Sequence, residues 1–393
     1  MKCDGYGQNQ KKKFTKHRKV HDLCSSLDEN NYVGVNQATE TTKYEVLLSK
    51  ATRNNPANKI TWVSKKPTNV GRTSAENVLK VKPGPSAAFQ QALTPIEAWE
   101  LFISPDIIQR IVFYTNQKIN YKNSLKTTCQ PYSYPTDEIE LKAYIGLRYF
   151  RGLEGKNQMN FRRLFKPSMG HQIFSSTMCL SRFQFLNVNI CFDDAATRPE
   201  RFDADRFAAF REIFEMFNTN CSEAMVPDGY LTIDETLYSC RIAVGFKQYN
   251  PSKPNRYGIL FKSINSVNFP FTHRTVVYAG KPQGTPGQYY VPGINPIVKS
   301  LVNGLSEKVC IDGNNITTDR LYTNFELCDW FLSKKITTIG TMMANKKGIP
   351  NELKKTDDRE HLSYECLWQI ENPRISLHSY VVEKKVLRRT FLL

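Results

Sequence analysis

The sequence predicts a mixed α+β fold, in which a helical N-terminal domain is followed by a mixed sheet with flanking helices. Apolar residues recur at helical spacing over residues 94–225, and from residue 230 the pattern changes to the alternation of strands. The signals after residue 230 follow the order β-β-β-α-β-α-β, which indicates a mixed sheet with helices on its faces. A chain of 393 residues is long enough for two or three such domains.

The net charge is the most unusual bulk property. The chain carries 54 Lys and Arg against 37 Asp and Glu, a formal balance of +17. Such an excess favours a polyanionic partner, and nucleic acid is the leading class. The ten cysteines lack the close spacing of zinc ligands, since the nearest pair is Cys179 and Cys191. We find no secretory signal and no apolar run that could span a bilayer, so we expect an intracellular protein without membrane association.

Residues 1–90 read as a basic and mostly disordered tail. Residues 1–85 hold 16 Lys and Arg against 7 Asp and Glu, with few periodic apolar residues. The basic run at residues 11–19 fits a nuclear localisation signal or a phosphate-binding tail, so we expect a nuclear protein. A solvated tail that binds nothing explains the same residues equally well.

Four helix signals define a helical domain over residues 91–228. The first is Thr94-Pro-Ile-Glu97, which has the form of a capping box with proline where a helix tolerates it. A second start signal follows at Ser104-Pro-Asp106, a third helix begins near Thr136, and a fourth carries four phenylalanines between Phe207 and Phe217. Aromatic residues at this spacing are typical of a core.

Residues 229–343 carry the strand pattern. Strands are expected over residues 230–239, 257–267, 272–279, 309–318 and 336–343, with helices over residues 296–305 and 324–333. The remaining residues, 344–393, are polar and irregular apart from a short strand candidate at residues 377–382.

Two carboxylates in this region are candidates for chemistry. Asp234 lies inside an apolar strand, and Asp319 lies at the end of another. An ionised Asp in a strand core needs a partner, and two of them in a basic protein suggest a divalent metal and a phosphate substrate. The alternative is that either Asp caps a turn or pairs with a nearby Arg. Glu235 alternates onto the opposite face and is a weaker candidate.

Other charged residues have two interpretations. Lys247, Lys253, Arg256 and Lys262 follow Asp234 in the sequence and are placed to grip DNA phosphates. The same residues fit a solvated strand edge, where lysine discourages aggregation. We assign Asp193 and Asp194 a structural role and Asp312 a turn, because neither setting favours convergence on one ion.

Five segments, in the same order, resemble the piggyBac transposase family. They are Thr94-Pro-Ile-Glu-Ala-Trp-Glu-Leu-Phe102, Asp228-Gly-Tyr-Leu-Thr-Ile-Asp-Glu235, Asn250-Pro-Ser-Lys-Pro-Asn-Arg-Tyr-Gly258, Thr317-Thr-Asp-Arg-Leu-Tyr-Thr-Asn324 and Gly340-Thr-Met-Met-Ala-Asn-Lys-Lys-Gly-Ile-Pro350. The resemblance implies a ribonuclease H-like core preceded by a helical dimerisation and DNA-binding domain. It also implies DNA transposition with Mg²⁺, a DNA partner and a homodimer. By position, Asp234 and Asp319 match the first two catalytic aspartates of the family.

The resemblance ends within residues 344–393, which we therefore interpret as a truncated insertion domain. The third catalytic carboxylate of the family is not found, so we expect an incomplete core, weakened Mg²⁺ binding and loss of strand transfer. The leading hypothesis is a transposable element-derived DNA-binding protein without this activity. Two alternatives stay open: an active metal-dependent transposase or nuclease from an incomplete gene model, and a non-enzymatic dimerisation or interaction module.

Overall fold

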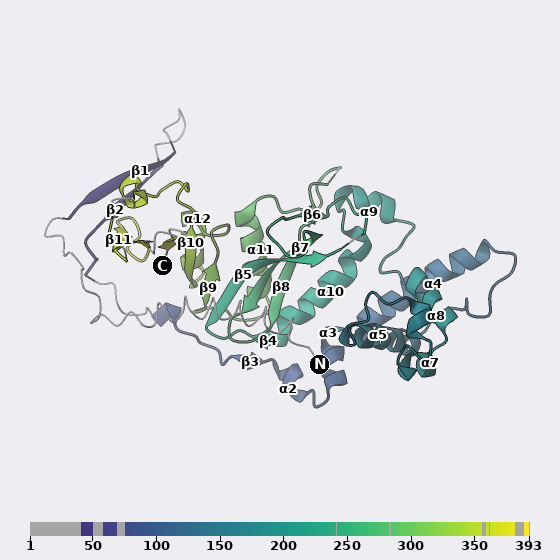
Figure 1. Cartoon of the computed structure of the whole chain (residues 1–393). Coiled ribbons are helices and arrows are strands. Elements are labelled where there is room, and N and C mark those ends of the chain that lie inside the picture. Colours follow the sequence, from purple (N-terminus) through teal and green to yellow (C-terminus); the bar gives the residue numbers. More distant parts are fainter. Residues whose placement is uncertain are drawn as a thin grey trace.

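The computed structural model describes residues 41–49, 58–68, 75–240, 242–282, 284–355, 359–360, 362–381 and 389–392. In Figure 1 a group of helices lies on the right, a sheet with its helices lies in the centre, and further strands extend to the left. None of the helices in the described ranges combines the length and the apolar character that a bilayer crossing requires. The expectations for the basic run at residues 11–19 lie outside the described residues.

The helical part forms largely where the sequence predicts it. Its elements are η1 (Ala75–Asn77), α2 (Ala87–Gln91), α3 (Pro95–Phe102), α4 (Pro105–Ser124), α5 (Glu138–Leu153), α6 (Phe161–Leu164), α7 (Gln172–Thr177), α8 (Leu180–Asn189), α9 (Arg198–Ala204) and α10 (Ala208–Ala224). Both bonds of the expected capping box are present at the start of α3, between Thr94 and Glu97. The helices α6, α7 and α9 were not predicted, because each is too short to show a helical period, and the ten-residue α8 was also missed.

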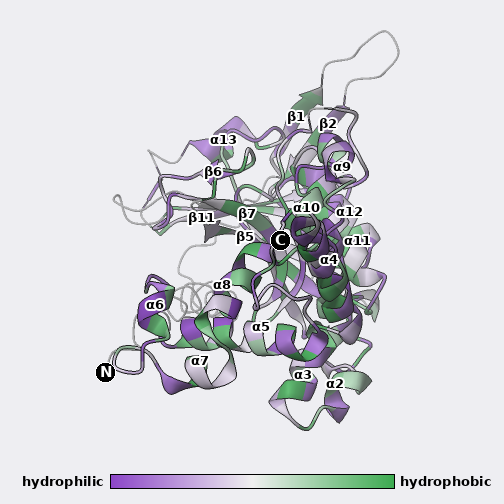
Figure 2. Cartoon of the chain, turned by 90° about the vertical axis from the view of Figure 1, so that its right-hand side faces the viewer, coloured by the Kyte–Doolittle hydropathy of each residue, from purple (hydrophilic) through white to green (hydrophobic). Residues whose placement is uncertain are grey.

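One apolar core holds these helices together. Figure 2 shows α5 and α8 with green and purple segments in alternation, as expected of amphipathic helices. The fully buried members include Ile107, Leu141 and Phe183, which come from α4, α5 and α8. Three helices that are separate in the sequence thus pack on one apolar cluster.

The central sheet has the expected order of elements. Its strands are β5 (Tyr230–Ser239), β6 (Gln248–Tyr249), β7 (Tyr257–Ser266), β8 (Thr272–Val277), β9 (Asn315–Thr318) and β10 (Thr337–Met342). Strands β5, β7 and β8 pair antiparallel, whereas β9 runs parallel to both β5 and β10. The spatial order β8-β7-β5-β9-β10 is that of a ribonuclease H-like core, which confirms the predicted fold class.

Helices cover both faces of this sheet. On one face, α11 (Ile294–Ser306) and α12 (Phe325–Ser333) bury Leu231, Ile233 and Ile316 in an apolar cluster. On the other face, Phe214 of α10 and Phe207, the residue before that helix, form a second cluster with Val277. The core role expected of the four phenylalanines is confirmed for these two, whereas Phe217 is 37% exposed and does not fit it. Residues 309–314 are not part of a strand, because a turn at Asp312 and Gly313, with φ of +84° at the glycine, precedes β9.

Further strands extend the sheet beyond β10. They are β1 (Lys43–Ser49), β2 (Asn58–Val63), β11 (Tyr364–Gln369), β12 (Ser376–Tyr380) and β13 (Arg389–Leu392), and α13 (Asn351–Lys354) lies beside them. Strand β13 pairs with both β10 and β12, and β11 pairs with both β12 and β2. Two short strands, β3 (Gly84–Pro85) and β4 (Met225–Val226), form a separate pair. The strand expected near residues 377–382 is thus present as β12.

Residues 43–63 correct part of the interpretation of residues 1–90 as a mostly disordered tail. Strands β1 and β2 form a hairpin within those residues, and Trp62 on β2 is fully buried. The indole Nε1 of Trp62 donates a hydrogen bond to the carbonyl oxygen of Gly348 at 2.8 Å, and its ring packs against Phe325. The hairpin is too short to show its period clearly in the sequence, and its partners lie about 300 residues away in the chain.

Candidate active site on β5 and after β9

Asp234 lies in the middle of β5 and Asp319 directly follows β9, at the point where the parallel pairing of the two strands ends. Ile233 of β5 is in register with Thr318 of β9, so the next residues, Asp234 and Asp319, lie across from each other. Residues in register on adjacent strands share a face and lie about 5 Å apart. The leucine and isoleucine positions of β5 point into the cluster under α11, so both aspartates are on the opposite face.

The local contacts of these carboxylates are short-range. One oxygen of Asp234 accepts the backbone N–H of Glu235 at 2.8 Å. One oxygen of Asp319 accepts the backbone N–H of Leu321 at 2.8 Å, so Asp319 caps the turn that leads to α12. This is the alternative role considered for Asp319. A carboxylate has two oxygens, and capping with one of them is compatible with metal binding through the other.

Glu235 is the next residue of β5 and lies on the face of α11. Its Oε2 accepts a hydrogen bond from Tyr322 Oη at 3.3 Å, and Lys253 Nζ lies 3.8 Å from its Oε1. Burial raises the pKa of Glu235, and the negative charges of Asp234 and Asp319 raise it further. Burial also raises the pKa of Tyr322, with Glu235 and the two aspartates adding to the effect. The negative charges of Asp234 and Asp319 therefore act on Glu235, so the three carboxylates interact electrostatically at this place in the sheet.

The chemistry of this place suits a hard cation such as Mg²⁺. Mg²⁺ takes oxygen ligands and is usually bound by one or two carboxylates, with water and substrate phosphate completing the set. Asp234 and Asp319 supply two such groups, and the unfavourable repulsion felt by Glu235 is the kind that a cation relieves. In the described parts of the chain, no three His, Cys, Asp or Glu side chains are grouped closely enough to hold a metal ion.

The four basic candidates are distributed differently. Arg256 is exposed, and Lys247 is half-buried with Nζ 5.8 Å from the centre of the Tyr257 ring. Lys253 is directed to Glu235, since Nζ also approaches the Glu235 carbonyl oxygen at 3.4 Å. These three residues lie around the loop between β6 and β7, beyond the end of β5.

Lys262 is in a different position from the one expected. It lies on β7 directly opposite Glu235 and is only 6% exposed. Burial lowers the pKa of Lys262, whereas the carboxylate of Glu235 opposes this shift. A side chain with so little exposed surface is poorly placed to contact a DNA phosphate. We therefore assign Lys262 the role of a counter-charge for Glu235.

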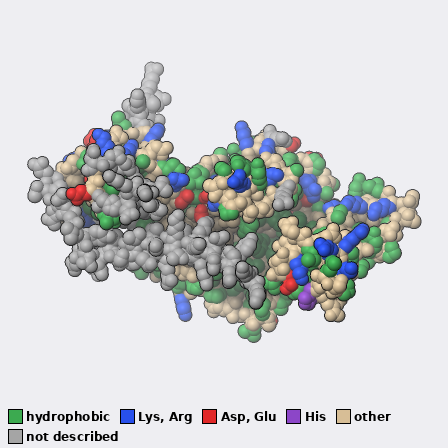
Figure 3. Space-filling view, viewed as in Figure 1, with side chains coloured by type: hydrophobic (Ala, Val, Ile, Leu, Met, Phe, Trp, Pro, Cys, Tyr) green, Lys and Arg blue, Asp and Glu red, His purple; other side chains and the backbone are tan. Residues whose placement is uncertain are grey.

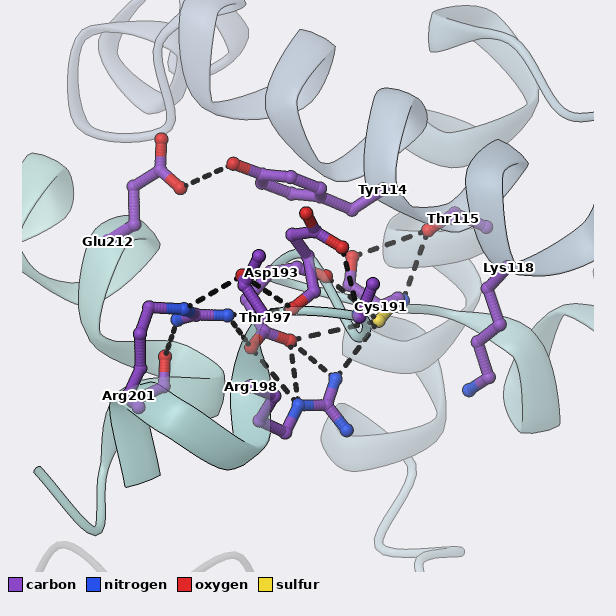
Figure 4. Close-up of polar contacts among 12 residues, drawn as sticks. Tyr114, Thr115, Lys118, Cys191, Asp193, Thr197, Arg198, Arg201 and Glu212 are labelled. Carbon is purple, nitrogen blue, oxygen red and sulfur yellow. Dashed lines mark hydrogen bonds and ion pairs between the residues drawn. The ribbon is translucent and has the colours of Figure 1, made fainter. Parts of the chain in front are cut away.

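The other acidic pair, Asp193 and Asp194, has the structural role that we expected. Figure 4 shows Arg198 and Arg201 directed at Asp193, which is 1% exposed. Arg201 Nη2 donates to Asp193 Oδ2 at 2.7 Å, and Arg198 donates to both carboxylate oxygens. Asp194 caps the following turn through Ala196 N–H. The contacts of Asp193 and Asp194 hold the segment between α8 and α9 in place, and we assign neither residue to the candidate active site.

Sequence reasoning missed Tyr322 and gave Glu235 too little weight. Tyr322 lies in the turn between β9 and α12, and it is fully buried. The alternation of β5 does show which face Glu235 is on. When β5 pairs with β7, the buried Lys262 lies opposite Glu235 on that face. That pairing cannot be read from either strand alone.

Several known proteins resemble this chain in sequence or fold. The sequence profile of the family described as Transposase IS4 matches residues 94–390. The human PiggyBac transposable element-derived protein 3 is 26% identical over 187 residues, which cover 46% of this chain and 29% of that protein. The human Chimeric ERCC6-PGBD3 protein has the same identity over a match of the same length, which covers 16% of its chain.

A solved structure supports the same conclusion. The piggyBac transposase in a synaptic complex with hairpin DNA, determined by cryo-electron microscopy, superposes with a TM-score of 0.70 at 28% sequence identity. The match covers 79% of this chain and 63% of that one, so the chain spans less than two thirds of the length of these relatives. The profile match over most of the chain, the relatives and the shared fold together establish that this chain belongs to the piggyBac transposase family.

Proposed function

We propose that this chain is a transposable element-derived protein that binds DNA and holds Mg²⁺ between Asp234 and Asp319, with weak or no strand-transfer activity. The observation that carries the proposal is the register of β5 and β9, which sets the two aspartates side by side. Two-metal phosphodiester transfer uses ions about 4 Å apart that carboxylates both bridge and flank. Two aspartates on one face supply enough carboxylate ligands for one metal ion but few for two.

The residues around the aspartates have distinct roles in this proposal. Asp234 and Asp319 hold the cation, which when bound supplies Lewis-acid stabilisation of charge on phosphoryl oxygens. Tyr322 and Lys253 hold Glu235 in place, which limits its repulsion of the aspartates. Arg256 and Lys247 contribute positive charge on the side from which a phosphate backbone approaches.

The DNA partner is supported by charge and by one structural neighbour. The formal balance of +17 gives the chain a long-range attraction for polyanions. The neighbouring piggyBac transposase was solved with hairpin DNA. A DNA-binding protein of this family acts where chromosomal DNA is, so we also propose a nuclear location, for which the basic run at residues 11–19 is a candidate signal.

A second candidate function is supported by the surface of the helical part. Large apolar side chains of α4 and α5 are exposed there, including Phe113 at 59%, Tyr121 at 66% and Ile139 at 81%. Exposed apolar residues gathered on one domain are typical of interaction surfaces. We propose that this face serves a homodimer, and that a role as a dimerisation module is the alternative if DNA binding fails.

DNA binding and plasmid nicking by the full chain test these proposals. Duplex affinity measured by fluorescence anisotropy should fall steeply as salt is raised, because phosphate contacts release counterions. Nicking of supercoiled plasmid with Mg²⁺ should be weak or undetectable. Absence of salt-dependent binding would leave the interaction module as the better account. Efficient nicking that Asp234→Asn abolishes would instead favour an active transposase or nuclease.

A further inference from the structure

Three exposed tyrosines follow the aspartates along the same face of the sheet. Tyr238 lies on β5, Tyr257 begins β7, and Tyr249 on β6 pairs directly with Tyr257. Tyr238 is opposite Ile259 on β7, which is two residues from Tyr257, so the pairing places all three rings on one face. That face is also the face of Asp234, because Tyr238 is four residues further along the same strand.

These rings are accessible and held in place. Tyr238, Tyr249 and Tyr257 are 62%, 53% and 56% exposed. The ring centres of Tyr249 and Tyr257 are 4.8 Å apart with an interplanar angle of 39°, so each ring restricts the other. Tyr238 packs edge-on against Phe261 at 5.2 Å, and Phe261 belongs to the core cluster under α10. The tyrosines therefore present ordered aromatic surface to solvent instead of filling the core.

The segment of sequence that carries these tyrosines is basic. Residues 236–258 contain four Lys and Arg and no Asp or Glu. Among these, Lys247 reaches the ring of Tyr257, and Arg256 next to it is exposed. In Figure 3, blue and green side chains are interspersed over the central upper part of the molecule, where Figure 1 places β6. Aromatic rings among cations, with no carboxylate between them, suit an anionic ligand that also has flat apolar groups.

The distance from the aspartates fits a short length of nucleic acid. Four residues of an extended strand span about 13 Å, which separates Tyr238 from Asp234. A nucleic-acid strand crosses that distance in a few nucleotides. Bases within a duplex are stacked on each other and do not offer their faces, whereas unpaired bases stack readily on exposed aromatic side chains.

We propose that Tyr238, Tyr249 and Tyr257 form a stacking surface for unpaired nucleobases of a DNA strand whose backbone lies at Asp234 and Asp319. This inference rests on the proposed DNA-binding function and specifies which form of DNA this surface takes. Lys247 and Arg256 hold the phosphates, and the tyrosines hold one or two bases out of the duplex stack.

Binding of a single-stranded oligothymidylate to the full chain tests the proposal, with a duplex of the same length as the comparison. Tyr249→Ala should weaken single-strand binding roughly 5- to 150-fold, since one base–aromatic stack is lost, and should leave duplex binding nearly unchanged. Tyr249→Phe keeps the ring and should bind as the unmodified chain does. Tyr364→Ala removes a tyrosine that is 44% exposed on β11, outside both proposed surfaces, and is the matched control.

A fluorescent base gives a direct second measurement. A 2-aminopurine placed in the oligothymidylate should change fluorescence on binding to the unmodified chain and to Tyr249→Phe, and much less on binding to Tyr249→Ala. Tyr238→Ala repeats the test from β5, independently of the Tyr249 and Tyr257 pair. Equal single-strand affinity with and without these rings, or an equal loss for duplex, would overturn the stacking surface while leaving DNA binding intact. Failure to bind either DNA would overturn both the surface and the proposed function.

Discussion

Trp62 provides a sharp test of how the N-terminal hairpin is held. The side chain is fully buried, its Nε1 donates to the Gly348 carbonyl oxygen at 2.8 Å, and its ring centre lies 5.3 Å from that of Phe325. Trp62→Ala removes the ring and its hydrogen bond, and large aromatic truncations in a core cost about 3–5 kcal/mol. Trp62→Phe keeps most of the apolar contact but leaves the Gly348 oxygen without this donor, at a cost of about 1–3 kcal/mol.

Hydrogen exchange of the backbone amides measures these costs locally. Protection of β2 and β11, which pair with each other, should fall by roughly 5- to 150-fold in Trp62→Phe and further in Trp62→Ala, since about 1.4 kcal/mol is tenfold in an opening equilibrium. Leu47→Ala changes an exposed residue of β1 in the same hairpin and is the matched control. Unchanged protection of β11 in Trp62→Ala would refute the conclusion that this tryptophan joins the hairpin to the distant strands.

Two further predictions concern buried polar groups. Burial lowers the pKa of His273 to about 4, so the unfolded chain takes up the proton first as pH falls below 6.5, and stability should decrease between there and about pH 4 by about 3 kcal/mol from this ring. His273→Gln should flatten that part of the pH dependence in denaturant unfolding, and an unchanged slope would contradict the assignment. Asp193→Asn should cost about 1–3 kcal/mol of unfolding free energy, because Arg198 and Arg201 lose a buried acceptor but remain partly exposed. Asp194→Asn is its control, and equal thermal stability of the two variants would show that the Asp193 contacts contribute little.

The sequence predicts those elements whose pattern is complete within one segment. The capping box at Thr94, the alternation of β5 and the apolar stripe of α11 each carry their signal locally, and each forms as expected. The strand assigned to residues 309–318 is shorter than expected, because the apolar residues before β9 are buried in a turn and not in a ladder. The hairpin of β1 and β2 could not be found this way, since its stability depends on partners at the other end of the chain.

The residues of the candidate site also differ in whether the local sequence reveals them. Asp234 and Asp319 were identified because each stands out in an apolar strand setting, and their register then follows from parallel pairing. Tyr322 and the buried position of Lys262 depend on which faces of β5 and β7 meet, and this is a tertiary property. The sequence also does not show the surroundings of a lysine in or near a strand. The local pattern is the same whether the side chain faces solvent or a buried carboxylate.

The most direct test of the central claim is the effect of Mg²⁺ on duplex affinity when Asp234 and Asp319 are both replaced by asparagine. Mg²⁺ should strengthen binding by the unmodified chain and by Asp312→Asn, a control carboxylate in the turn before β9, relative to binding in EDTA. In the double variant the Mg²⁺ effect should disappear, while affinity in EDTA stays equal or rises slightly because two negative charges are removed. A folded double variant that keeps the Mg²⁺ effect, or that loses much of its affinity in EDTA, would contradict the assignment of these two aspartates.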